Sequence, residues 1–290
     1  MRTAYEPAAS LRQPDYLFRI RVAGFFSPLT SGHVNSSTPG IEPELHARRA
    51  ASFGAKAAAY ATHRPDYPEK ALAWGLAGAR ETPERVLDLA AGTGKVSEGL
   101  LALGVTVTAV EPDAQMLEEL TKAFPAVTPL IGTAERIPLP DASVDAVVAG
   151  QAFHWFHLDR AYPEIARVLK PGGTVAALWN HDDESAGWLA ELNTLIKASA
   201  SRRWLSDYES LPEHEAFEPF EKKTFGHKQP RTAETLVATL ATHSHMLVAD
   251  EEEREAKLRA AREFLDGNPE TASGEFDLPL TTTVFRARRR

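Results

Sequence analysis

The sequence of 290 residues contains no cysteine. This absence excludes disulfide-stapled scaffolds, thiolate zinc sites, iron–sulfur clusters and cysteine nucleophiles. A chain without cysteine is typical of a reducing compartment, so we expect a cytoplasmic protein. We also predict no metal site.

The sequence also lacks a basic surplus and a long apolar run. Lysine and arginine number 32 against 40 aspartates and glutamates, for a formal net charge of -8. General binders of nucleic acids or anionic membranes normally carry the opposite charge. The most apolar stretch, residues 17–26, is interrupted by Arg19 and Arg21 and falls short of the roughly 18 residues of a membrane span. We therefore expect neither a nucleic-acid partner nor a membrane partner, and the composition leaves the oligomeric state open.

The first 45 residues contain five prolines and no sustained helical or alternating pattern. We therefore expect residues 1–45 to be an irregular N-terminal extension and residues 46–290 to form the folded domain. Within that domain, an alanine-rich run over residues 46–60 predicts a helix. The prolines of residues 63–68 should end it.

Short apolar runs alternate with helical segments from residue 86 onward. Strands are expected at residues 86–89, 105–110, 127–131, 144–149 and 174–178. Helices are expected at residues 96–103, 114–123 and 159–169, with Pro171, Gly172 and Gly173 ending the last of them. Because these strands are apolar without interruption, both of their faces should be buried, which is typical of a mostly parallel sheet between helices. The pattern predicts a doubly wound α/β fold.

The second half of the sequence is less regular. It predicts helices at residues 185–199, 232–240 and 251–265 and strands at residues 223–227 and 278–286.

Residues 86–97 leave a strand, turn through Gly92 and Gly94 and enter a helix, as phosphate-binding loops do. A nucleotide-triphosphate loop is excluded because Lys95 is followed by Val96 and a leucine occupies the position of the first glycine. A dinucleotide fingerprint is weakened, though not excluded, because Ser97 occupies the position of its third glycine.

Two acidic residues favour a third interpretation. Asp88 lies within the strand before the glycine turn, and Glu111 ends the next strand. A carboxylate beside the turn suits an ammonium group, and an acidic strand end can accept both hydroxyls of a ribose. Together they suit a ligand with an amino acid at one end and a nucleoside at the other, namely S-adenosylmethionine. The structural alternatives are a helix cap for Asp88 and a solvated strand end for Glu111.

Five segments strengthen this interpretation: VLDLAAGTGKVSEGL, VTAVEPDAQML, GTAERIPLPDASVD, VVAGQAFHWF and VLKPGGTVAALWN. Their order and spacing resemble those of the class I S-adenosylmethionine-dependent methyltransferases. The likeness is greatest to the small-molecule branch with ubiquinone-biosynthesis-type and trans-aconitate-type enzymes. It covers residue 46 to the carboxyl end and implies a Rossmann-like, seven-stranded, mostly parallel sheet with helices on both faces and an antiparallel last strand.

The resemblance also implies a set of cofactor-binding residues. Asp88 and the backbone around Ala90, Gly92 and Gly94 would hold the methionine portion, and the family often has glycine at the position of Ala90. The remaining expected contacts are Glu111 for the ribose, Pro112 and Met116 for the adenine faces, Ala134 and Glu135 for the adenine edge, and Gln151 near the methionine end. Met116 is equally consistent with an ordinary helix core, and Glu135 with a surface charge.

Residues around the expected acceptor site complete the prediction. His154 is the candidate general base, with a structural hydrogen bond as its alternative. The expected lid and substrate residues are Tyr60, Arg64, Tyr67 and Trp179, and residues 180–220 are expected to be a substrate-covering insertion. The sequence therefore predicts methyl transfer from S-adenosylmethionine to a small organic acceptor, at oxygen, carbon or nitrogen. An NAD(P)-dependent oxidoreductase and a non-catalytic cofactor-binding regulatory protein are the alternatives.

Overall fold

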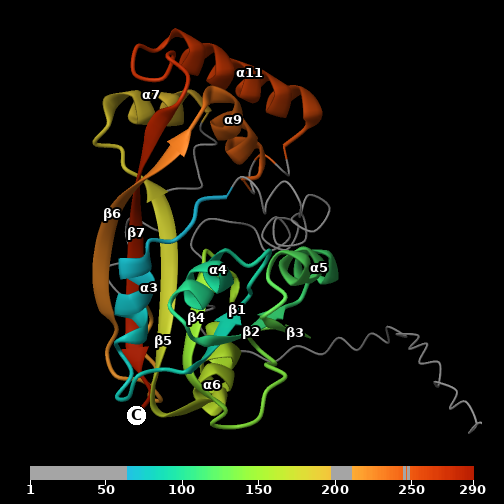
Figure 1. Cartoon of the computed structure of the whole chain (residues 1–290), viewed down its shortest axis with the longest axis vertical. Helices are drawn as coiled ribbons and strands as arrows, with labels where there is room; N and C mark the ends of the chain where they lie inside the picture. The colour runs from blue at the N-terminus through green and yellow to red at the C-terminus, as the bar shows by residue number, and fades with distance from the viewer. Residues whose placement is uncertain (1–63, 197–210, 244–245, 247–248) are drawn as a thin grey trace, which may run out of the picture. The chain divides into compact units, whose positions relative to one another are not determined.

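The computed structural model describes residues 64–196, 211–243, 246 and 249–290, all of which belong to one compact unit. Seven strands form one sheet in the order β3-β2-β1-β4-β5-β7-β6 (Figure 1). The strands are β1 (Arg85–Leu89), β2 (Thr106–Glu111), β3 (Thr128–Ile131), β4 (Val144–Gly150), β5 (Leu169–Asp182), β6 (Glu221–Arg231) and β7 (Phe276–Arg288).

Strand direction follows the prediction. The strands β1 to β5 pair in parallel, and β7 is antiparallel to both β5 and β6. The central strands β1 and β4 are buried almost throughout, because helices cover both faces of the sheet. The predicted seven-stranded, doubly wound α/β fold with an antiparallel last strand is confirmed.

Helices connect the strands and supply the apolar side chains that cover them. They are α3 (Glu69–Leu76), α4 (Lys95–Ala102), α5 (Ala114–Ala123), α6 (Leu158–Val168), α7 (Gly187–Ile196), α9 (Ala233–Ala241) and α11 (Glu251–Gly267), with a short 3-10 helix η2 (Phe153–Trp155). On one face, Leu72 of α3 and Leu100 of α4 pack with the sheet; on the other, Ile165 of α6 does so. The sheet therefore lies between two apolar layers.

The predicted bounds of α5 are confirmed, because its amino end carries a strong local signal. The Asp113 carboxylate accepts hydrogen bonds from the backbone amides of Gln115 and Met116, which cap the helix. By contrast, helix α3 was not predicted, and the helix predicted at residues 46–60 lies outside the described residues.

The end of α6 differs from the prediction. The helix stops at Val168, and β5 begins at once with Leu169, so that the proline and glycines expected to lie between them are inside the strand. Gly172 adopts φ +80, and a Cβ on Gly173 would lie 2.7 Å from the Asp145 carbonyl oxygen. The register of β4 and β5 also shifts here, so the Pro-Gly-Gly segment forms an irregular, bulge-like start to the strand.

The second half of the chain builds a helical lobe at the carboxyl end of β5. Figure 1 shows α7, α9 and α11 together at one end of the long strands β5, β6 and β7. The lobe has its own apolar core, in which the rings of Trp188 and Phe276 lie 5.5 Å apart. Residues 211–220, which belong to the predicted covering insertion, pack beside α6, with Leu211 and Phe217 buried there.

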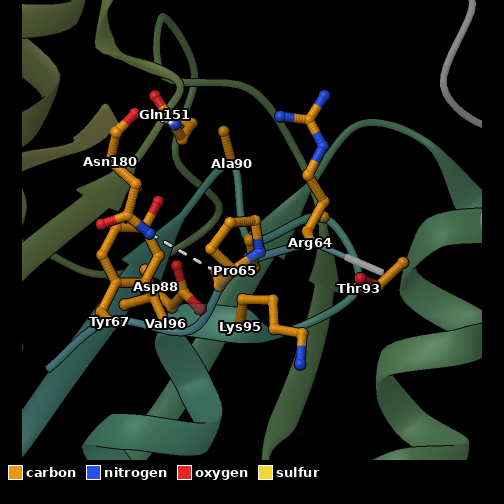
Figure 2. A pocket seen from close by; sticks show the side chains of 13 residues that line it. Arg64, Pro65, Tyr67, Asp88, Ala90, Thr93, Lys95, Val96, Gln151 and Asn180 are labelled. Carbon is orange, nitrogen blue, oxygen red and sulfur yellow. Dashed lines mark hydrogen bonds between the residues drawn. The ribbon is translucent and has the colours of Figure 1, made fainter. Parts of the chain in front are cut away.

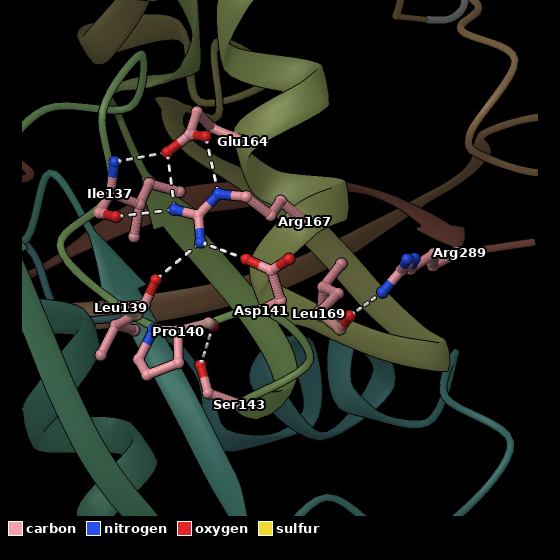
Figure 3. A network of polar contacts seen from close by, with 9 residues as sticks. All are labelled: Ile137, Leu139, Pro140, Asp141, Ser143, Glu164, Arg167, Leu169 and Arg289. Atoms are coloured by element: carbon pink, nitrogen blue, oxygen red, sulfur yellow. Dashed lines mark hydrogen bonds and ion pairs between the residues drawn. The ribbon is translucent and has the colours of Figure 1, made fainter.

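A network around Arg167 fixes the loop that leads into β4 (Figure 3). The guanidinium donates to the carbonyl oxygens of Ile137 and Leu139, and to the carboxylates of Glu164 and Asp141, at 2.7–2.9 Å. Glu164 also accepts a hydrogen bond from the Ile137 amide at 2.9 Å. In the same view, Arg289 donates to the Leu169 carbonyl oxygen. The loop is thus tied to α6 by charge-assisted hydrogen bonds.

We expect Arg167→Met to lower the free energy of unfolding by about 2–3 kcal/mol, because it removes the charged donor that the Glu164 carboxylate and two carbonyl oxygens share. Urea-induced unfolding measures this change. The matched control is Arg160→Met, an exposed arginine of the same helix, which should change stability by less than about 0.5 kcal/mol. Equal effects of the two substitutions would contradict a stabilising role for the network.

Candidate cofactor and active site

The turn between β1 and α4 forms the centre of the candidate site. Three of its residues have left-handed backbone: Ala90 at φ +58, Gly92 at φ +56 and Gly94 at φ +93. A Cβ on Gly92 would meet nothing within 4 Å, whereas one on Gly94 would lie 2.9 Å from the Phe124 ring. Gly92 therefore leaves room for a ligand, and Gly94 is required for packing against α5. Ala90 adopts the conformation that glycine takes most easily, which is a physical reason for glycine at this position in the family.

Asp88 is a fully buried carboxylate at the end of β1. Its Oδ2 accepts a hydrogen bond of 2.7 Å from the Ser97 hydroxyl, but its Oδ1 has no partner among the described residues. Burial, only partly opposed by the Ser97 hydrogen bonds, raises the pKa of Asp88 from 3.8 to about 7. A buried carboxylate with an unsatisfied oxygen costs stability and commonly marks a functional site.

Glu111 joins the two turns at the carboxyl ends of β1 and β2. Its carboxylate accepts hydrogen bonds from the amides of Gly92 at 2.9 Å and Asp113 at 3.0 Å. Burial raises the pKa of Glu111, and these two amides oppose the shift. A carboxylate has about four lone-pair sites, so two remain for other donors. Glu111 is thus a buried bridge between two loops rather than a solvated strand end.

A pocket opens above this turn (Figure 2). It brings together six of the predicted site residues: Arg64, Tyr67, Asp88, Ala90, Gly92 and Gln151. Its other lining residues are Pro65, Ala91, Thr93, Lys95, Val96, Gly150 and Asn180. The hydroxyl of Thr93 is buried and, like Asp88 Oδ1, has no partner among the described residues. The pocket lining therefore contains two buried polar oxygens without a partner among the described residues.

Lys95 and Asn180 are lining residues that the sequence analysis missed as site residues. Lys95 begins α4 and forms an ion pair of 2.7 Å with Asp66. Burial opposes its charge, but Asp66 and Glu98 together outweigh this effect and raise the pKa of Lys95. Asn180 lies on β5 and donates to the Asp66 carbonyl oxygen at 3.0 Å. The position of Lys95 directly after the glycine turn was a local signal that could have identified it. No local signal indicated Asn180.

The residues expected around the adenine lie at the neighbouring turns. Pro112 is exposed after β2, and Met116 and Ala134 are each 3% exposed. The Glu135 carboxylate accepts a hydrogen bond of 2.9 Å from the backbone amide of His157, at the start of α6. The structure therefore gives this side chain a partner in the protein itself.

His154 lies outside the pocket lining, in η2. Its Nδ1 accepts a hydrogen bond of 3.3 Å from the indole N–H of Trp179, and its ring packs on Trp155 at 4.6 Å. A neutral histidine that accepts at Nδ1 carries its proton on Nε2. This contact agrees with the structural alternative for His154, and its role as general base stays a prediction. Trp179 itself is 2% exposed and belongs to the core beside Phe285, so it does not line this pocket.

Two of the predicted features, Tyr60 and the extension of residues 1–45, lie outside the described residues. Within the described parts of the chain, no three histidine, aspartate or glutamate side chains gather as a metal site. No helix in those same parts combines the length and apolarity needed to cross a membrane.

Comparisons with known proteins indicate the family of this chain. The profile of the family described as a methyltransferase domain matches residues 87–177. Rv3342 of Mycobacterium tuberculosis, named an uncharacterized methyltransferase, is 39% identical over 237 residues, which cover 81% of this chain and 95% of that protein. The ubiquinone/menaquinone biosynthesis C-methyltransferase UbiE of Rubrivivax gelatinosus is 33% identical over 134 residues, 44% of this chain and 53% of the enzyme.

A solved structure agrees as well. A protein from Anaeromyxobacter dehalogenans, assigned as a type II methyltransferase, matches with a TM-score of 0.55 and 28% identity, over 78% of this chain and 97% of that one. The chain therefore belongs to the class I S-adenosylmethionine-dependent methyltransferases and is an enzyme. This result sets aside the oxidoreductase and the non-catalytic regulatory protein as alternatives.

Proposed function

We propose that the pocket between β1 and α4 binds S-adenosylmethionine, and that the enzyme transfers its methyl group to a small organic acceptor. The observation that carries this proposal is Asp88, whose unsatisfied, buried oxygen lines the pocket. An ammonium group is the most suitable partner for such an oxygen, because it donates hydrogen bonds and also carries the opposite charge.

The other residues fit the remaining parts of the cofactor. The open space at Gly92 allows a close approach to the backbone. The two remaining lone-pair sites of Glu111 suit the hydroxyls of a ribose, and Gln151 stays the predicted contact near the methionine end. Exposed Pro112 and buried Met116 and Ala134 are assigned to the adenine, at the turns beyond Glu111.

Bound S-adenosylmethionine would supply an electrophilic methyl group on its sulfonium. The task of the chain is then to orient an acceptor and to exclude water. The lobe of α7, α9 and α11 supports this role, because Arg64 of the pocket donates to the Thr242 carbonyl oxygen at 2.8 Å, just after α9. His154 stays the candidate general base, with the hydrogen bond from Trp179 as its structural alternative.

Calorimetric titration tests the cofactor assignment. S-adenosylmethionine should bind to the wild-type protein, and NAD should not. Glu111→Ala should weaken binding by about 10- to 100-fold, because the ribose hydroxyls lose their acceptor.

Two controls accompany this titration. Glu81→Ala, which removes an exposed glutamate, should leave the affinity unchanged. Urea unfolding of Glu111→Ala separates a loss of binding from a loss of folding, since Glu111 also holds two backbone amides. Wild-type affinity in folded Glu111→Ala would remove this residue from the site. Single-turnover assays with a panel of acceptors then test the proposed substrate class.

A further inference from the structure

Three neighbouring strands carry a row of hydrogen-bonded side chains behind the pocket. We call His227 on β6, Thr282 on β7 and Asn180 on β5 the polar row. Thr282 is 0% exposed and lies opposite Asn180 in the β5–β7 register. Its hydroxyl is 2.5 Å from Asn180 Oδ1 and 3.0 Å from His227 Nε2. Neither His227 nor Thr282 lines the pocket.

The direction of these hydrogen bonds follows from proton counting. The Asn180 amide nitrogen donates to the Asp66 carbonyl oxygen at 3.0 Å, and the Pro65 carbonyl oxygen lies 3.5 Å away. Asn180 Oδ1 is then the acceptor, so the Thr282 hydroxyl donates its single proton there. His227 must donate to Thr282 and therefore carries a proton on Nε2. Burial lowers the pKa of His227, which keeps this side chain neutral near pH 7, although the charge of Asp66 opposes the shift.

The polar row ends on the two segments that form one wall of the pocket. Asn180 holds the segment of residues 64–67 through its side chain. Its backbone carbonyl oxygen accepts a hydrogen bond of 3.0 Å from Gln151 Nε2, and Gln151 has the unfavourable backbone angle φ +54. A strained residue persists only where its surroundings hold it. Figure 2 shows Asn180, Gln151 and Tyr67 on the same side of the pocket.

We propose that His227 and Thr282 are positioning residues for the methyltransferase, which fix the pocket wall formed by residues 64–67 and Gln151 through Asn180. This inference rests on the proposed function, because one of its tests measures the affinity for S-adenosylmethionine. His227 and Thr282 do not line the pocket, so their effect is to hold it in the binding-competent shape before the ligand arrives. Loss of the Thr282 hydroxyl leaves the half-buried Asn180 Oδ1 and His227 Nε2–H without this partner, which frees the Asn180 amide to turn.

The test compares four proteins: wild type, Thr282→Val, Thr282→Ser and Thr283→Val. Valine has the shape of threonine without the hydroxyl, serine restores the hydroxyl, and Thr283 lies on the same strand with its side chain on the opposite face. We expect Thr282→Val to weaken S-adenosylmethionine binding by about tenfold, and the other two variants to stay within about threefold of wild type. Wild-type affinity in Thr282→Val, or equal losses in Thr282→Val and Thr282→Ser, would overturn the proposal.

Measurements on the ligand-free protein separate this inference from the proposed function. Amide hydrogen exchange at Asp66 and Tyr67 should be about tenfold faster in Thr282→Val than in wild type or Thr283→Val. Nitrogen-15 NMR should show the Nε2–H tautomer of His227 in wild type. If wild type does not bind S-adenosylmethionine, the proposed function fails, and these two measurements still decide the role of the row. Unchanged exchange, or an Nδ1–H tautomer, would overturn it.

Discussion

Asp88→Asn should reduce S-adenosylmethionine affinity by at least about 100-fold while making the ligand-free protein more stable. The asparagine oxygen can still accept the Ser97 hydrogen bond, which directs its NH₂ group to the position of the unsatisfied Oδ1. An NH₂ group there repels an ammonium, and the loss of a buried charge partner costs several kcal/mol. Titration calorimetry measures the affinity. Unchanged affinity would remove Asp88 from the cofactor site.

The stability gain should depend on pH in a defined direction. The pKa of Asp88 is raised from 3.8 to about 7 by burial, so the folded protein resists ionisation that the unfolded chain undergoes. The wild-type protein therefore loses stability from this group as pH rises from about 4 to 7, at up to about 1.4 kcal/mol per pH unit. The advantage of Asp88→Asn should grow over the same range and level off above it. Thermal unfolding from pH 5 to pH 8 measures this, and Asp159→Asn, at an exposed aspartate, is the control.

The same titration should control cofactor binding by the wild-type protein. An ammonium group binds to ionised Asp88, so affinity should rise with pH up to about 7 and change little beyond it. Asp88→Asn removes this dependence. An affinity that is flat between pH 5 and pH 7 would contradict either the raised pKa or the contact with the ammonium group.

Gly94→Ala should lower the free energy of unfolding by about 3 kcal/mol, which is the second of the two largest effects that we expect. Its Cβ would lie 2.9 Å from the Phe124 ring and 3.0 Å from Leu120, and its backbone angle φ +93 is strained for alanine. Gly104→Ala is a matched control, because Gly104 has φ +79 but nothing within 4 Å of a Cβ. It should cost about 1 kcal/mol, which is the backbone strain alone. Urea unfolding of both variants separates strain from steric overlap, and equal losses would contradict the packing argument.

Gly92→Ala distinguishes folding from binding at the same turn. Its φ is +56 and the space around a Cβ is empty, so we expect a loss of about 1 kcal/mol in stability, as for Gly104→Ala. Cofactor affinity should nevertheless fall, because the methyl group enters the space proposed for the ligand. The two glycines of the turn thus have different roles, although the sequence analysis assigned both to the cofactor.

Local signals explain the parts of the fold that the sequence predicted. Continuous apolar runs indicated five of the buried or edge strands, and Asp113 marked the start of α5. The prediction failed where the same local sequence is compatible with two different structures. Pro171, Gly172 and Gly173 end a helix in isolation, but here they are accommodated at the irregular start of β5, where the neighbouring strand leaves room only for glycine at residue 173.

The sequence by itself determined the chemistry of the candidate cofactor site, because Asp88, Gly92 and Glu111 lie close together in the chain around consecutive strand ends. Only the tertiary structure decided which distant residues complete it. Asn180 reaches the segment at Asp66 across 114 residues, and Thr282 reaches Asn180 across 102. It also decided that the Nδ1 of His154 accepts a hydrogen bond from the indole N–H of Trp179, 25 residues away. Sequence patterns report local backbone preference and burial, whereas these contacts depend on strand register and on which side chains a folded sheet brings face to face.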